Sequence, residues 1–167
     1  MGITWQGNPR FPADRHRSIP LAAFAPLADV PGVCLISLQK DFGSEQLAAL
    51  NGRFPVAEAG QFDEDSAVDH AAILMNLDLM VTSDTAMAQL AGALGVPVWV
   101  ALSCVPNWRW LLDRDDSPWY PTMRLFRQTS SGDWVGVFRR IQAALEDRVR
   151  VWRFGGRLSV EKPRGAP

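Results

Sequence analysis

Residues 77–103 read LDLMVTSDTAMAQLAGALGVPVWVALS and predict a strand, a polar turn, a helix and a second strand. The first strand, at 79–82, is a short apolar run with β-branched residues, which is typical of a strand covered on both faces. Apolar residues of the helix recur at helical spacing, at Met87, Leu90, Ala91 and Leu94. Gly95 and Pro97 end this helix before the second strand, at 98–102. A strand–helix–strand unit this short predicts parallel strands joined by a right-handed crossover.

The polar turn joins the carboxyl end of one strand to the amino end of the helix, and it consists of Ser83, Asp84, Thr85 and Ala86. Asp84 is expected to N-cap the helix. Free backbone N–H groups and the helix dipole favour an anion at this end, and open α/β sheets bind ligands at this edge. The small Ala86 allows a phosphate to approach the backbone, and the Thr85 hydroxyl can donate to it. The alternative is a capped helix start that binds no ligand.

The rest of the chain repeats this alternation of apolar runs and helical patterns. Strands are expected at 2–6, 33–38, 54–58, 79–82, 98–102 and 124–127, with helices between them. This pattern predicts an α/β fold with a doubly wound, Rossmann-like parallel sheet in the order 3-2-1-4-5-6. We expect one domain over residues 1–150. A basic tail with glycine and proline, residues 151–167, is expected to be loosely ordered.

Composition excludes several classes of protein. Charged residues make up 21% and hydrophobic residues 47% of the 167 residues, as in an ordinary globular protein, and the net charge of −1 predicts no nucleic-acid partner. No apolar run approaches about 18 residues and no signal peptide is recognised, so we expect no transmembrane segment and a cytoplasmic location. Cys34 and Cys104 lie in or beside apolar runs without metal-ligand spacing. We therefore expect reduced core thiols, no metal and no cofactor.

A second candidate phosphate-binding segment is the polar loop at 7–18, which carries Gly7, Arg15 and Arg17. Arginines supply charge and forked hydrogen bonds that suit a phosphate, although a solvated surface loop is the alternative. In the expected sheet order this loop and the turn at 83–86 meet at the topological switch point. His16 is expected to be exposed or structural. The glycine-rich nicotinamide fingerprint and the Walker A loop are absent, so the ligand is expected to be another nucleotide.

Several motifs give the chain a family resemblance over roughly residues 2–146. They are TWQGNP at 4–9, DRHRSIP at 14–20, SLQK at 37–40, NLDL at 76–79, TSDTA at 82–86, LAGALG at 90–95, WRW at 108–110 and SPWYP at 117–121. In this order they resemble the heptosyltransferase-like family 9 glycosyltransferases that are fused to tetratricopeptide repeats in bacteria. The resemblance implies the carboxyl-terminal, donor-binding half of a GT-B fold, which holds a nucleoside diphosphate sugar.

The resemblance also implies roles for individual residues. Ser83, Asp84, Thr85 and Ala86 would contact the diphosphate and sugar, and Gly7, Arg15 and Arg17 would face them across the cleft. Gln89 stands where the family usually has histidine, and glutamine cannot carry a proton or a positive charge. The acceptor site and general base belong largely to the amino-terminal GT-B domain, which we expect to lie on missing sequence or a partner chain. We therefore expect donor-site residues here and no catalytic residue.

Two functions follow from these observations. The first is a nucleotide-sugar-binding domain of a glycosyltransferase that transfers a sugar from a nucleoside diphosphate to an unidentified acceptor. The alternative is a non-catalytic truncated domain, or a module that binds a nucleotide or a protein. In that case the aromatic residues expected at the surface, Trp108, Trp110, Trp119 and Tyr120, would form an orphaned interdomain surface.

Overall fold

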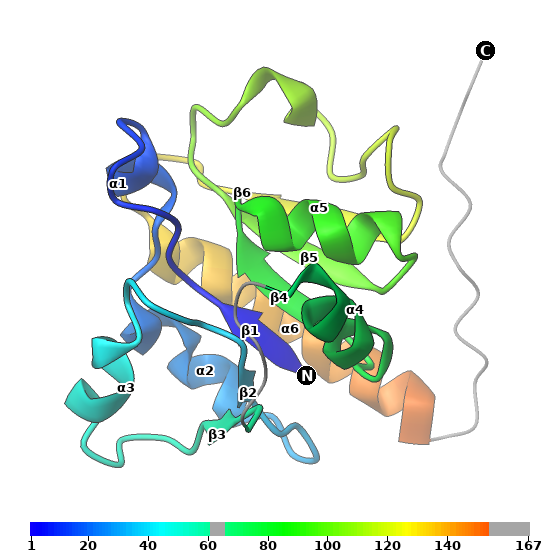
Figure 1. The fold of residues 1–167 in the computed structure, drawn as a ribbon. Helices are drawn as coiled ribbons and strands as arrows, with labels where there is room; N and C mark the ends of the chain where they lie inside the picture. The colour runs from blue at the N-terminus through cyan, green and yellow to red at the C-terminus, as the bar shows by residue number, and fades with distance from the viewer. Residues whose placement is uncertain (61–65, 154–167) are drawn as a thin grey trace.

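The computed structural model describes residues 1–60 and 66–153, which form a parallel sheet between two layers of helices (Figure 1). The strands described are β1 (Gly2–Thr4), β2 (Ile36–Ser37), β3 (Ala57–Glu58), β4 (Met80–Ser83), β5 (Val98–Leu102) and β6 (Met123–Arg127). Their order across the sheet is β3-β2-β1-β4-β5-β6, and each neighbouring pair is parallel. The predicted α/β class and doubly wound strand order are confirmed.

Helices cover both faces of this sheet. The helices described are α1 (Asp14–Arg17), the 3₁₀ helix η1 (Leu21–Phe24), α2 (Ala25–Ala28), α3 (Glu45–Ala49), α4 (Ala67–Met75), α5 (Ala86–Ala93), the 3₁₀ helix η2 (Trp108–Trp110) and α6 (Trp134–Arg153). Figure 1 shows α4 and α5 in front of the sheet and α6 behind it. No helix that the structure describes combines the length and apolar character needed to cross a bilayer.

The core is divided by the sheet into two apolar layers, because successive side chains of a strand point to opposite faces. One layer packs sheet residues such as Val81 and Trp99 against Phe24 and Phe138, whose ring centroids are 4.4 Å apart. The other layer packs sheet residues against α4 and α5; its members include Met80, Val98, Val100, Leu74, Ala88 and Ala91. Strands β4 and β5 are buried throughout, which explains their continuous apolar sequence.

Strand and helix limits differ from the predicted ones where side chains bind the backbone. Strand β1 ends at Thr4 rather than at 6, because the N–H groups of Trp5 and Gln6 donate to the Gln39 side chain and not to a neighbouring strand. The outer strands β2 and β3 have two residues each. Helix α6 continues to Arg153, past the expected domain end at 150, and residues 154–167 of the predicted tail lie outside the described residues.

The predicted cap of α5 is wrong. The N-cap is Thr85, whose extended backbone (φ −131°, ψ 176°) precedes a helix that begins at Ala86, and no side chain caps it. Leu94 follows the helix and is 36% exposed, so it does not belong to the buried face. That face consists of the small residues Ala88, Ala91 and Gly92, which allow α5 to lie close to its neighbours.

Two further sequence predictions are corrected by burial. Cys34 is exposed and Cys104 is half-buried, so neither free thiol belongs to the core. Trp110 is fully buried and cannot contribute to an exposed aromatic surface, whereas Trp108 and Trp119 are exposed. The reason is that η2 turns Trp110 inward against the apolar layer formed by β5 and β6.

The close packing of α5 can be tested at Gly92. A Cβ atom there would lie 2.6 Å from Cγ of Tyr120, which is ring carbon and cannot move aside freely. Gly92→Ala should therefore lower the free energy of unfolding by about 1–3 kcal/mol in urea denaturation, despite the better helix propensity of alanine. The double variant with Tyr120→Ala should show a destabilisation smaller than the sum of the two single changes. Additive effects would contradict this packing.

Candidate functional site

Two loops meet at the carboxyl edge of the sheet between β1 and β4. These strands are neighbours, with Thr4 opposite Thr82, and the two hydroxyl oxygens of this pair lie 2.6 Å apart. The next strand along from β1 on the other side is β2, so the chain leaves β1 at the topological switch point. A cavity of about 360 Å³ lies here and is lined by Gln6, Gly7, Asn8, Arg17, Gln39, Lys40, Asp41, Phe42, Thr85, Ala86 and Met87.

Arg17 is held in place on three sides. Its Nε donates to Asp14 Oδ1 at 3.0 Å, and its Nη1 donates to the Asp84 carbonyl oxygen at 2.7 Å. Its guanidinium also lies 4.6 Å from the centroid of the Phe11 ring. The positive charge of Arg17 is therefore fixed at the cavity before any ligand arrives, which reduces the entropy lost on binding.

Asp14 is a site residue that the sequence interpretation missed. It is 3% exposed, and its second oxygen, Oδ2, accepts a hydrogen bond from Ser18 Oγ at 2.7 Å. Ser18 Oγ in turn accepts from the Gly7 N–H at 3.3 Å. A Cβ atom on Gly7 would come within 3 Å of both Asp14 Oδ1 and Arg17 Nη2, so a larger residue here would displace the Asp14–Arg17 pair. The only sequence signal was the Asp14–Arg17 spacing of three residues, which a single helical turn brings together.

The other side of the cavity is the first turn of α5. Thr85, Ala86 and Met87 line it. The first N–H groups of a helix have no partner within the helix, and the N-terminus carries partial positive charge. The Thr85 hydroxyl lies 3.4 Å from that of Thr82. Arginine charge and helix N–H groups thus face the same cavity, an arrangement suited to an anion.

The predicted site residues divide into two groups. Gly7, Arg17, Thr85 and Ala86 line the cavity together. The others are outside its lining: Arg15, Ser83, Asp84 and Gln89.

The residues of the second group have different surroundings. Arg15 is exposed, and its Nε donates to His16 Nε2 at 3.0 Å. Ser83 is completely buried, and its Oγ has no partner among the described residues. Asp84 contributes its carbonyl oxygen to Arg17. Gln89 is half-buried, one turn further along α5 than Thr85.

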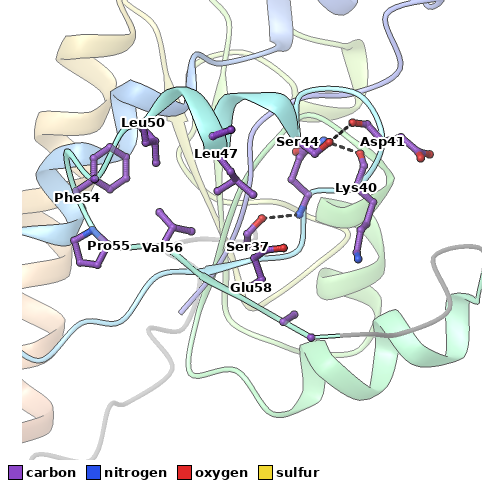
Figure 2. Close-up of a pocket in the computed structure, with 15 residues that line it drawn as sticks. Ser37, Lys40, Asp41, Ser44, Leu47, Leu50, Phe54, Pro55, Val56 and Glu58 are labelled. Atoms are coloured by element: carbon purple, nitrogen blue, oxygen red, sulfur yellow. Dashed lines mark hydrogen bonds between the residues drawn. The ribbon is translucent and has the colours of Figure 1, made fainter.

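A larger cavity of about 840 Å³ adjoins the first one, between β2, α3 and β3 (Figure 2). Its lining includes the apolar residues Leu47, Leu50, Phe54 and Val56 and the polar residues Ser37, Gln39, Lys40, Asp41, Ser44 and Glu58. Figure 2 shows Leu50 and Phe54 at one end, and Lys40, Asp41 and Ser44 at the other. Gln39, Lys40 and Asp41 line both cavities, so the two are neighbours.

Within residues 1–60 and 66–153, no group of three or more His, Cys, Asp or Glu side chains is placed to hold a metal ion. Positive charge at the two cavities comes from Arg17 and Lys40, and negative charge comes from Asp41 and Glu58. Arg17 lies in the smaller cavity and Glu58 in the larger one. The lining of the smaller cavity therefore has two positive groups and one negative group, and Asp14, outside this lining, is paired with Arg17.

Comparison with known proteins gives one distant similarity. No family model matches the chain, and no solved structure matches it. The chain is 28% identical over 151 residues to Protein FlbA of Caulobacter vibrioides, an alignment that covers 88% of this chain and 25% of FlbA. The chain therefore spans about a quarter of the length of this relative.

The two arginines of the first loop should differ in anion binding. Arg17→Ala should weaken binding of inorganic pyrophosphate by about 1.5–3 kcal/mol, the usual size of a hydrogen bond to a charged group. Arg15→Ala removes the same charge two residues away, where the side chain is exposed, and should change affinity little. Isothermal titration calorimetry at low salt would measure both. Equal losses in the two variants would mean that net charge, and not the cavity, determines binding.

Proposed function

We propose that this chain is the donor-binding domain of a glycosyltransferase and holds the diphosphate of a nucleotide sugar in the smaller cavity. One observation carries the proposal: Arg17 and the first turn of α5 line the same cavity at the switch point of the sheet. Charge-assisted hydrogen bonds from a guanidinium, together with a helix N-terminus, are a common way to hold phosphate oxygens.

Small residues support the choice of a diphosphate. Ala86 at the start of α5 has a small side chain, so a ligand can approach the helix backbone there, and Gly7 leaves room for the Asp14–Arg17 pair beside the cavity. A diphosphate offers several anionic oxygens to the fixed Arg17 and to the N–H groups of α5. Arg17 is already paired with Asp14, but a neutral ligand would gain less from the guanidinium than an anion, because charge-assisted hydrogen bonds are stronger than neutral ones.

The larger cavity is proposed to accommodate the nucleoside. Its volume of about 840 Å³ falls in the range of small-molecule sites, and its apolar end suits a planar base. Since the two cavities share Gln39, Lys40 and Asp41, one ligand can extend from the diphosphate position into the second cavity. The sequence interpretation did not identify this cavity, because its walls come from three separate elements.

The proposed reaction is transfer of the sugar from the nucleoside diphosphate to an acceptor. This domain would contribute by fixing the donor and by neutralising the negative charge that develops on the departing diphosphate. By the family resemblance, the acceptor site and general base belong to the other GT-B domain. We therefore propose that the 167-residue chain alone binds the donor without transferring the sugar.

A binding module without transfer activity is the second candidate. The observation that favours it is that Gln89, which stands where the family usually has histidine, lies outside the lining of the smaller cavity. A glutamine cannot carry the positive charge that a histidine could place near a diphosphate. Transfer activity in the presence of the amino-terminal domain distinguishes the two candidates.

The diphosphate should dominate binding. In calorimetric titrations with ADP, GDP, UDP and CDP, at least one should bind about tenfold or more tightly than its nucleoside, because charge-assisted contacts add about 1.5 kcal/mol or more. The preference for the diphosphate should fall as salt is raised. If every nucleoside binds as tightly as its diphosphate, the proposed diphosphate site is wrong.

A further inference from the structure

Gln39 connects the loops that follow two different strands. It is 8% exposed and lies two residues beyond β2. Its side-chain Oε1 accepts from the N–H groups of Trp5 and Gln6, at 2.9 and 3.0 Å. Its Nε2 donates to the carbonyl oxygens of Gln6, Lys40 and Phe42, at 3.0, 3.4 and 2.7 Å. One amide therefore joins the loop after β1 to the turn after β2.

The turn that Gln39 holds, residues 40–42, borders both cavities. Lys40 and Asp41 line both of them, and Phe42 lines the smaller one. Asp41 has a positive φ of 50°, a conformation that is uncommon for residues other than glycine, although aspartate tolerates it better than most. Such a conformation persists where surrounding bonds fix it. Here those bonds include the two from Gln39 to the neighbouring carbonyl groups.

A second amide supports the same region from the other side. Gln46 Nε2 donates to Gln6 Oε1 at 3.1 Å, and Gln46 Oε1 accepts from the Leu21 N–H at 2.9 Å. Trp5 Nε1 donates to the Gly43 carbonyl oxygen at 3.1 Å. The shape of both cavities thus depends on side chains that fix the backbone as well as on strand pairing. Gln39 lies at the centre of this arrangement.

We propose that Gln39 is a positioning residue of the nucleotide site, whose amide sets the relative position of the loop carrying Gly7 and the turn carrying Lys40. The inference rests on the proposed function. The amide group is essential to it, because an amide presents an oxygen acceptor to two N–H groups and, on the same group, two N–H donors to the carbonyl oxygens of Gln6 and Phe42, with a longer contact to that of Lys40. A carboxylate of the same shape would place an anionic oxygen against those carbonyl oxygens.

Gln128 provides a matched control. It is also buried, at 5% exposure, and also follows a strand at the carboxyl edge of the sheet. Its Oε1 accepts from the Gly132 N–H at 3.2 Å, its Nε2 has no hydrogen-bond partner among the described residues, and it lines neither cavity. Gln39→Glu and Gln128→Glu therefore make the same chemical change at similar burial, near the site and away from it.

The experiment measures the affinity of the native protein, Gln39→Glu and Gln128→Glu for the nucleoside diphosphate that the native protein binds best. Circular dichroism and urea denaturation first show that the variants are folded. At pH 8, Gln39→Glu should weaken binding about tenfold or more, because the carboxylate cannot donate to the backbone carbonyl oxygens of Gln6 and Phe42 and is repelled by them. Gln128→Glu should stay within about twofold of the native affinity.

A pH series supplies a readout that general destabilisation does not share. Burial and the facing carbonyl oxygens raise the pKa of a carboxyl group at position 39, and its protonated form again donates a hydrogen bond. The affinity of Gln39→Glu relative to native protein should therefore recover as pH falls from about 8 to 5.5. The charged groups lining the two cavities that Gln39 borders, Arg17, Lys40, Asp41 and Glu58, are present in both proteins, so the ratio of affinities removes their own titration.

Each outcome decides the inference. Loss of affinity in Gln39→Glu, with recovery at low pH and an unchanged control, supports it. Native-like binding by a folded Gln39→Glu, or equal losses in both variants, overturns it and leaves the proposed function intact. A second variant, Gln39→Asn, keeps the amide group on a shorter side chain. If Gln39→Glu and Gln39→Asn both fail to fold, the inference is overturned, because Gln39 would then support the whole fold. Failure of the native protein to bind any nucleoside diphosphate overturns the proposed function first and the inference with it.

Discussion

The pairing of β1 with β4 is the constraint on which the site depends. It places Thr4 opposite Thr82, so the segments that follow β1 and β4 leave the sheet side by side and in the same direction. Parallel strands share one carboxyl edge, and at this pair the connections diverge to opposite sides of the sheet. The bond from Arg17 Nη1 to the Asp84 carbonyl oxygen then joins the two departing segments. Without this register, the arginine and the first turn of α5 would have no common cavity.

Much of the architecture was predictable because it depends on buried apolar area. Continuous apolar runs identified β4 and β5, and their alternation with helices predicted the order of the whole sheet. The limits of elements were less predictable, because they depend on single polar contacts. Strand β1 ends where Gln39 captures two N–H groups, and α5 begins one residue later than the polar turn suggested. Hydrophobic periodicity carries no information on such contacts.

The candidate site was predictable only in part, for a related reason. Gly7, Arg17, Thr85 and Ala86 line one cavity as expected, whereas Arg15 does not. Positions two apart on a helix point in different directions, and the sequence does not show which one faces the sheet. Gln39 was missed because its partners are backbone atoms, some of them in a segment distant in the sequence. Asp14 has local side-chain partners, Arg17 and Ser18, and only the spacing to Arg17 indicated it.

The most direct test of the account is a nuclear magnetic resonance titration of the ¹⁵N-labelled chain with a nucleoside diphosphate. If the diphosphate lies at the switch point, the backbone N–H signals of Gly7, Ala86 and Met87 and the Arg17 Nε–H signal should shift together and saturate at one affinity. The nucleoside alone should move signals of residues in the larger cavity, such as Leu47 and Val56, and leave the first group nearly unchanged. Saturable shifts located elsewhere, with these four signals unmoved by the diphosphate, would contradict the account.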